Sequence, residues 1–132
     1  MNPFIIEQSE FSPSIIFDPS NSKFEITGES RPENAGKFYE SVIKWLDQYY
    51  DDILSKKELS STEKIYFDIK LEYFNSTSAK YILDLLKVLD NYYKNGHLAK
   101  INWHFDALDE DMKDSGEQFS KLVKVPFAFI QQ

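Results

Sequence analysis

The sequence predicts an α/β domain of two layers, a mixed five-stranded sheet with its helices mainly on one face. Segments with a period of two residues alternate with segments of helical period, in the order β-β-α-β-α-β-α-β. Strand-helix-strand units of this kind place parallel strands side by side through right-handed crossovers. The strands alternate apolar and polar side chains, which is typical of a sheet with one covered and one open face.

The N-terminal part supplies the antiparallel pair of the predicted sheet. Residues 1–13 are weakly patterned, and we expect them to form a loose arm. Strands are predicted at Ser14–Asp18 and Lys23–Thr27, because residues 19–22 between them favour a turn. The loop Gly28–Asn34 then ends the second strand.

Two long helices are predicted from apolar stripes of helical period. The first runs from Asn34 to about Ile53. The second follows Asn75 and the hydroxyl cluster after it and runs to about Asn95, where Gly96 can stop it. The stripe of the first helix is Phe38, Val42, Trp45, Tyr49 and Ile53, with Tyr39, Ile43, Leu46 and Tyr50 beside it. The stripe of the second is Ile82, Leu85, Leu86, Leu89, Tyr92 and Tyr93.

The remaining strands follow from alternation, and Lys64–Phe74 is the clearest of them. Further strands are predicted at Lys100–Asp106 and Phe127–Ile130, on either side of a short helix capped by Asp109. In the short helix we expect Met112, Phe119 and Leu122 to face the core. The side chains predicted to lie inward in the strands are Ile65, Phe67, Ile69, Leu71, Tyr73, Ile101, Trp103 and Phe105. Those predicted to lie outward are Tyr66, Asp68, Lys70, Glu72, Lys100, Asn102 and His104.

Composition narrows the class of protein. A chain of 132 residues suits one domain, here residues 1–132, and 42% hydrophobic residues are enough for a core. There is no Cys for a disulfide or a zinc-thiolate site, and no apolar run approaches the length of a membrane span. The N-terminus lacks a signal-peptide layout. We therefore expect a cytoplasmic protein that does not insert into membranes.

The charge is negative and uneven. A formal net charge of −7 argues against nucleic acid as a partner, because phosphate contacts need clustered Lys and Arg. The segment from Asp106 to Glu117 contains six acidic residues and one base, Lys113. A run of this kind is most often a solvated face.

Three loops should converge at one edge of the sheet. In a parallel sheet the carboxyl ends of the strands share an edge, and the loops there usually form the functional sites. Gly28–Asn34, Asn75–Ser78 and Asp106–Asp111 all leave strands at that edge.

The middle loop, Asn75-Ser76-Thr77-Ser78, has two interpretations. In one, a Ser, Thr or Asn caps the following helix and the others fill the turn. In the other, one hydroxyl accepts a phosphoryl group, because a helix N-terminus offers free N–H groups and a partial positive charge. The pattern alone leaves both open.

The sequence predicts no catalytic residues, no metal ligands and no cofactor. Walker A, GxSxG and GxGxxG motifs are absent, and neither His97 nor His104 has a visible nucleophile near it in the pattern. The run Asp109–Asp111 lacks the spacing and the turn glycine of an EF-hand.

Several short motifs, in order and at matching spacing, resemble the SiaC-type regulatory phosphoprotein family. They are Gly28–Asn34 (GESRPEN), Phe38-Tyr39, Trp45-Leu46, Tyr73–Lys80 (YFNSTSAK), Trp103–Asp106 (WHFD), Asp109–Asp111 (DED) and Gly116–Phe119 (GEQF). The resemblance runs from about Ile15 to Ile130, which is nearly the whole chain.

The resemblance implies a fold similar to STAS domains and anti-sigma-factor antagonists. It also implies partners: a serine/threonine kinase of the histidine-kinase-like ATPase class, a PP2C-like phosphatase, and a diguanylate cyclase or other effector. The unphosphorylated form of the type member binds and activates a diguanylate cyclase, which tunes cyclic-di-GMP and biofilm formation. By resemblance the chain is a binding protein and not an enzyme.

The family's phosphoacceptor falls on Ser76, since it directly follows the Asn of the loop motif. The family has Thr-Ser-Ser there, whereas this chain has Ser-Thr-Ser, so Thr77 remains the alternative acceptor. Arg31 is the cation that we expect to pair with the phosphate, unless it is a solvated loop residue. The predicted switch and partner surface is Asn75, Thr77, Ser78, Lys80, Glu29, Arg31, Glu33, Asp106, Asp109, Glu110 and Asp111.

Two other functions remain at this stage. An anti-sigma-factor antagonist would use the same switch with a transcriptional output, so that only its partner differs. A small metal-dependent hydrolase that uses the acidic loop is the more remote alternative.

Overall fold

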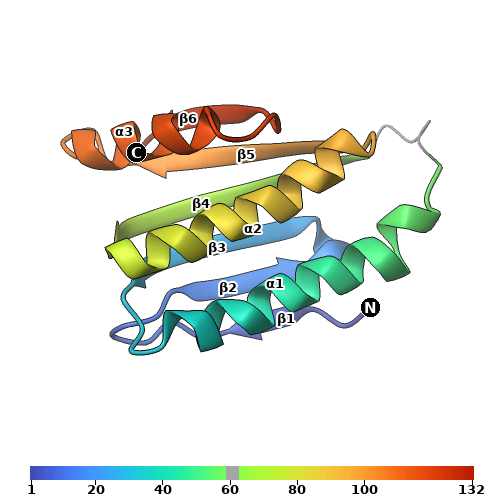
Figure 1. Cartoon of the computed structure of the whole chain (residues 1–132), viewed down its shortest axis with the longest axis horizontal. Helices are drawn as coiled ribbons and strands as arrows, with labels where there is room; N and C mark the ends of the chain where they lie inside the picture. Colours follow the sequence, from blue (N-terminus) through green and yellow to red (C-terminus); the bar gives the residue numbers. More distant parts are fainter. Residues whose placement is uncertain (59–62) are drawn as a thin grey trace.

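A computed structural model of the chain describes residues 1–58 and 63–132 as a six-stranded sheet covered by three helices (Figure 1). The strands are β1 Phe4–Ile6, β2 Ser14–Asp18, β3 Lys23–Ser30, β4 Lys64–Phe74, β5 Leu98–Phe105 and β6 Phe127–Gln131. The helices are α1 Ala35–Asp52, α2 Ser76–Lys94 and α3 Glu110–Ser120, with short 3-10 turns at Pro19–Asn21 and Leu54–Lys56.

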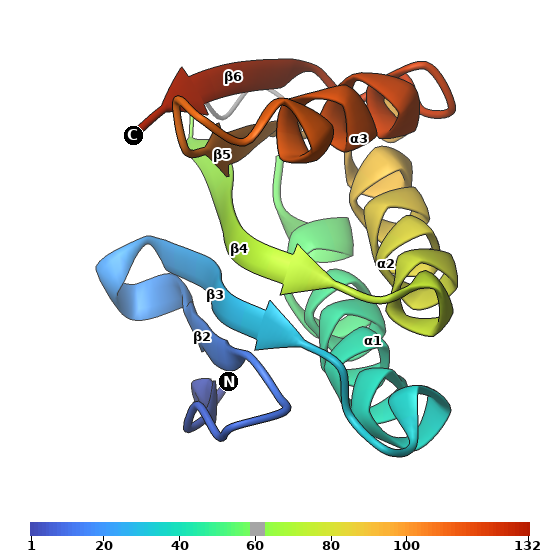
Figure 2. The same ribbon diagram turned by 90° about the vertical axis from the view of Figure 1, so that its left-hand side faces the viewer.

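The strands lie in the sheet in the same order as in the sequence. The pairs β1–β2 and β2–β3 are antiparallel, whereas β3–β4, β4–β5 and β5–β6 are parallel. All three helices lie on one side of this sheet (Figure 2), which confirms the predicted two-layer arrangement. Because each crossover from β3 onward contains one helix, α1 and α2 run side by side in the same direction (Figure 1).

Aromatic side chains form much of the core between the layers. Phe17 and Phe67 meet edge to face, with ring centroids 6.1 Å apart, and Trp45 stacks on Tyr49 at 5.3 Å. Trp103 is fully buried, and its indole Nε1 donates to the carbonyl of Met112 at 2.9 Å. This bond ties α3 to β5, as a buried indole N–H needs an acceptor.

The sixth strand is the first correction to the sequence prediction, which had five strands and a loose arm over residues 1–13. Residues 4–6 pair with β2, so that Phe4 lies opposite Phe17. The ring of Phe4 packs 6.3 Å from that of Trp45, whose indole nitrogen donates to the carbonyl of Asn2. The segment was missed because three residues are too few to show a period.

A second correction concerns the ends of β3 and β4. The register moves from Gly28 opposite Leu71 to Glu29 opposite Tyr73, so one extra residue of β4 lies at this point. Such a bulge shifts the alternation by one residue. Tyr73, predicted to lie inward, is therefore 49% exposed, and Phe74 packs on Trp103 instead. The strand β3 also continues to Ser30 beyond its predicted end at Thr27.

Burial differs from the prediction at four further positions. Tyr93, predicted in the apolar stripe of the second helix, is 41% exposed. Leu122 is 61% exposed, since α3 ends at Ser120 before reaching it. Phe105 is only half-buried. His104 lies on the open face of the sheet but is buried. The side chains of Asp68 and Gln132 cover its ring and hydrogen-bond to its two nitrogens at 2.8 and 2.7 Å.

Candidate functional site

The three predicted loops do converge. Each helix begins at the same end of the molecule, just beyond the carboxyl ends of β3, β4 and β5 (Figures 1 and 2). Each is capped by a side-chain oxygen that accepts a backbone N–H: Asn34 from Lys37, Asn75 from Ser78 and Asp109 from Met112, at 2.8 to 3.0 Å. We call this end of the molecule, formed by residues 28–34, 75–78 and 106–111, the loop edge.

The cap of α2 is Asn75, which leaves Ser76 and Thr77 free of that task. Ser76 and Thr77 are the first two residues of the helix, and both are exposed. Asn75 is fixed from the other side, since its own N–H donates to the carbonyl of Ser30 at 3.1 Å. Two exposed hydroxyls thus lie at a helix start that is bonded to β3, where the partial positive charge of the helix favours an anion.

The third hydroxyl, Ser78, is fully buried, so its predicted place on the partner surface is wrong. Its hydroxyl donates to the carbonyl of Ser30 at 3.1 Å and accepts from the Ser30 hydroxyl at 2.9 Å. Ser30 is also bonded to the Tyr39 hydroxyl at 2.5 Å. As the hydrogen of Ser30 goes to Ser78, Tyr39 donates in this last bond.

These three residues join the first two loops of the edge through a closed hydroxyl cluster, Ser30–Tyr39–Ser78. Tyr39 is fully buried, and its burial raises the pKa of its hydroxyl to about 12, while the bond to Ser30 acts in the opposite direction. The cluster fixes the position of the first turn of α2 relative to β3 and α1. The predicted partner surface did not include Ser30 or Tyr39, although Ser30 lies in the predicted loop Gly28–Asn34. The bond that gives Ser30 its role joins it to Ser78, 48 residues away in the sequence.

The cation expected to receive the phosphate, Arg31, is engaged elsewhere. Its Nε donates to Glu29 at 3.2 Å, and its guanidinium lies 5.0 Å from the centre of the Phe11 ring. Lys80 lies one helical turn beyond Ser76, at the i,i+4 spacing that brings two side chains together on a helix. Lys80 is exposed and its ammonium lies 4.6 Å from the centre of the Tyr81 ring, without an ion pair among the described residues, so it is the cation best placed along α2 to meet a phosphate on Ser76.

Two carboxylates of the acidic loop accept hydrogen bonds from nearby backbone N–H groups. Asp106 accepts the N–H of Leu108 at 2.9 Å and Asp109 caps α3, whereas Glu110 and Asp111 are exposed in the first turn of α3. Glu33, in the first loop, is exposed as well. Among residues 1–58 and 63–132 the structure shows no group of three or more His, Cys, Asp or Glu arranged to hold a metal ion.

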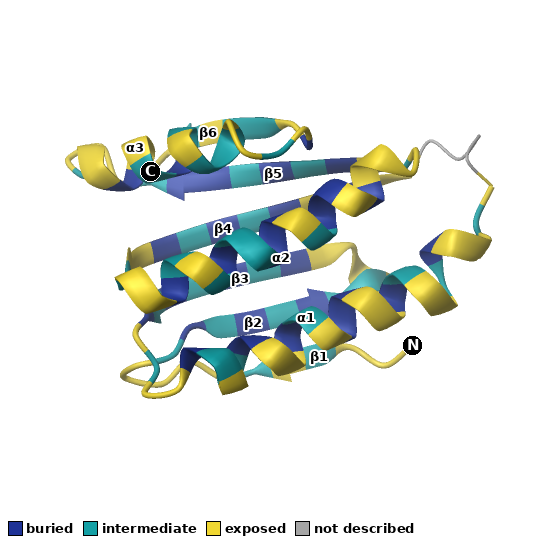
Figure 3. Ribbon diagram, viewed as in Figure 1, coloured by how far each residue is buried: buried dark blue, intermediate teal, exposed yellow. Residues whose placement is uncertain are grey.

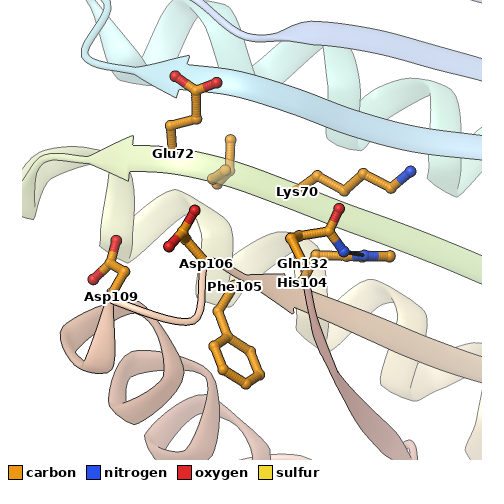
Figure 4. A pocket seen from close by; sticks show the side chains of 8 residues that line it. Lys70, Glu72, His104, Phe105, Asp106, Asp109 and Gln132 are labelled. Carbon is orange, nitrogen blue, oxygen red and sulfur yellow. Dashed lines mark hydrogen bonds between the residues drawn. The ribbon is translucent and has the colours of Figure 1, made fainter.

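A pocket of about 420 Å³ lies beside the acidic loop on the open face of the sheet. The pairing of β4 with β5 ends at Ile69 opposite Trp103, after which the two strands follow different neighbours. Figure 4 shows the side chains that surround the resulting hollow. Its lining residues are Lys70, Leu71, Glu72, His104, Phe105, Asp106, Asp109 and Gln132.

Among the described residues, no helix is both long enough and apolar enough to cross a membrane.

Comparison with known proteins gives consistent matches. The sequence model of the SiaC family of regulatory phosphoproteins matches residues 6–132. The uncharacterized protein PA14_02130 of Pseudomonas aeruginosa (strain UCBPP-PA14) is 27% identical over 128 residues, which are 97% of this chain and 95% of that protein.

Solved structures agree over nearly the full length. The crystal structure of apo-SiaC from Pseudomonas aeruginosa superposes with a TM-score of 0.82 at 24% identity, covering 98% of this chain and 99% of that one. The crystal structure of the diguanylate cyclase SiaD in complex with its activator SiaC, from the same organism, gives a TM-score of 0.82 at 25% identity with the same coverage.

The topology and these matches define the class: a two-layer α/β domain with the SiaC fold. The chain belongs to the SiaC family of regulatory phosphoproteins.

Proposed function

We propose that this chain is a phosphorylation-switched binding protein whose unphosphorylated form binds and activates a diguanylate cyclase. The main support for this proposal is the pair of exposed hydroxyls at the start of α2, in a chain that belongs to a family of regulatory phosphoproteins. The structure of the relative SiaC as activator of SiaD supports the choice of effector. In this proposal the protein acts in the cytoplasm and performs no catalysis of its own.

Ser76 is the proposed acceptor, and Thr77 is the alternative. Both are exposed, whereas Ser78 is enclosed by its bonds to Ser30 and cannot enter a kinase active site without unfolding the first turn of α2. A phosphate on Ser76 gains from the helix N-terminus by about 0.3–1 kcal/mol at an exposed position, and from Lys80 one turn away. The fold should therefore tolerate the modification.

The phosphoryl group acts on the partner and leaves the fold in place. It adds a charge of about −1.5 to −2 and three acceptor oxygens to a surface that already contains Glu33, Glu110 and Asp111. A partner that packs against the unmodified loop edge loses that contact and meets added negative charge. We propose a kinase of the histidine-kinase-like ATPase class for the modification and a PP2C-like phosphatase for its removal.

Capture of partners from the native host tests this function. Wild type and Ser76→Ala should both retain a diguanylate cyclase, and Ser76→Asp should retain at least about tenfold less, the effect of about 1.4 kcal/mol. Phosphopeptide mapping after incubation with the host kinase should place the phosphate on Ser76. Labelling of Thr77 in both wild type and Ser76→Ala would move the site by one residue, and no labelling in residues 75–78 would reject the switch.

The identity of the captured protein decides between the two outputs. Capture of an anti-sigma factor in place of a cyclase would assign the chain to the antagonist class, with the same switch.

A further inference from the structure

A groove runs between α1 and α2 on the side of the helices that faces away from the sheet. It has a volume of about 640 Å³. Figure 3 shows exposed residues along the sides of α1 and α2 that face away from the sheet. Its residues are Gly36, Glu40, Ile43, Lys44, Asp47, Gln48 and Asp51 of α1, and Tyr81 and Asp84 of α2. From Gly36 to Asp51 the α1 wall extends about 22 Å at 1.5 Å per residue.

The floor of the groove is apolar and firmly held. Ile43 and Tyr81 are both partly exposed there, although each packs against the core. The Tyr81 ring stacks on that of Tyr39, with planes 2° apart and centroids 6.1 Å apart. Gly36 permits this approach, because a Cβ at that position would come within 2.8 Å of the Tyr81 hydroxyl.

The walls contain more acidic than basic residues, and the ammonium group of Lys80 lies 4.6 Å from the centre of the Tyr81 ring at one end of the groove. Glu40, Asp47, Asp51 and Asp84 face a single base, Lys44, and none of the ion pairs in the described part of the chain includes any of the five. Asp47 and Asp51 are like charges at i,i+4, which destabilises a helix. Partial burial, and then proximity to Asp51, raise the pKa of the Asp47 carboxyl.

We propose that this groove is a docking surface for a partner helix with a stripe of Lys or Arg beside apolar residues. A helix fits because the groove is long, open and bounded by two parallel helices, against which a third can pack at 8–10 Å between axes. A cationic stripe fits because docking removes water from the carboxylates, and this desolvation is unfavourable unless opposite charges replace the water. Apolar side chains of the partner would cover Ile43 and Tyr81.

This surface is distinct from the loop edge, and the proposal does not depend on phosphorylation or on the diguanylate cyclase. It can therefore be tested with a synthetic probe. The probe is an 18-residue amphipathic helix of Leu and Lys with blocked ends, and its control is the same peptide with Glu at every Lys position. Binding to the full chain is measured by fluorescence anisotropy at physiological ionic strength.

Two double variants and a matched control decide the result. Asp47→Asn/Asp51→Asn and Glu40→Gln/Asp84→Asn each remove two carboxylates from the groove. Glu7→Gln/Glu10→Gln removes two exposed carboxylates from the N-terminal segment and has the same net charge. All three preserve side-chain size, and unfolding curves verify that each is folded.

The Leu–Lys peptide should bind wild type and the Glu7/Glu10 control with affinities within about twofold of each other. Each groove variant should bind it roughly tenfold more weakly, because two carboxylates that pair with lysines of the peptide are lost. Equal affinities for the groove variants and the control, equal binding of the Leu–Glu peptide, or no binding by wild type would each overturn the proposal.

Discussion

Ser76 and Ser78 lie two residues apart in the same helical turn, yet the hydroxyl of Ser76 is open to solvent and that of Ser78 is fully enclosed. The difference arises from the helix, since two residues rotate the side chain by about 200° around the axis. One hydroxyl is then free for chemistry, and the other fixes the helix start to Ser30 and Tyr39. The same residue type serves two purposes because its position relative to the core differs.

The strongest test places a carboxylate at each of the two positions. Ser78→Asp should lower the free energy of unfolding by about 3 kcal/mol or more, because it buries a charge among groups that offer no cation. Ser76→Asp should change it by less than about 1 kcal/mol, in the stabilising direction, because of the helix N-terminus. Urea unfolding monitored by tryptophan fluorescence gives both values, and equal effects at the two positions would end the distinction.

Alkaline pH tests the buried end of the hydroxyl cluster. The pKa of Tyr39 is raised to about 12 by burial, above the value of 10.0 for a free tyrosine. The folded state holds the proton of the Tyr39 hydroxyl more tightly than the unfolded state does. The resulting contribution to stability is fully present below pH 10 and is lost as the pH rises through 10 toward 12. At 1.36 kcal/mol per pKa unit the loss is at most about 2–3 kcal/mol. Wild type should therefore lose more stability than Tyr39→Phe between pH 9 and 11.5, and parallel curves would contradict this.

Removing the central hydroxyl of the cluster should have an intermediate effect. Ser30→Ala removes the acceptor of the buried Tyr39 hydroxyl and one of the two bonds of the Ser78 hydroxyl, which costs about 1–3 kcal/mol. Tyr39→Phe in the Ser30→Ala background should then cost less than it does in wild type. A double-mutant cycle by thermal unfolding measures this coupling, and additive effects would show that the cluster does not act as a unit.

The cap gives the smallest expected change. Asn75→Ala removes the acceptor for the N–H of Ser78 and should cost about 1 kcal/mol, whereas Asn75→Asp keeps an acceptor and should be nearly neutral. Hydrogen exchange at the first turn of α2 provides the local readout. Protection that is unchanged in Asn75→Ala would show that Ser30 alone holds the helix start.

Local sequence signals located most elements of the fold. The strand Lys64–Phe74 was predicted with its observed bounds, and Asp109 was predicted as the cap of α3. Asn34 was recognised as the start of the first helix, whereas the cap of α2 was left open among residues 75–78. The stop of α2 was also visible. Gly96 has a φ of +93°, and the N–H groups of Gly96 and His97 donate to the carbonyls of Tyr93 and Tyr92 in the Schellman pattern.

Errors arose where the arrangement depends on residues from other strands. The bulge that turns Tyr73 outward arises from the pairing of β4 with β3, and the alternation of side chains in β4 does not predict it. His104 stands at an outward position, but its burial depends on Asp68, 36 residues away, and on Gln132 at the end of the chain.

The sequence by itself determined the order of elements, the convergence of the three loops and the place of Ser76 at the start of a helix. Periods, caps and turns act over about four residues, and the chain order of strands limits which loops can share an edge. Only the tertiary structure decided which hydroxyl of the loop is enclosed. That choice rests on Ser30, 48 residues from Ser78, and a hydrogen bond across such a distance leaves no periodic mark in the sequence.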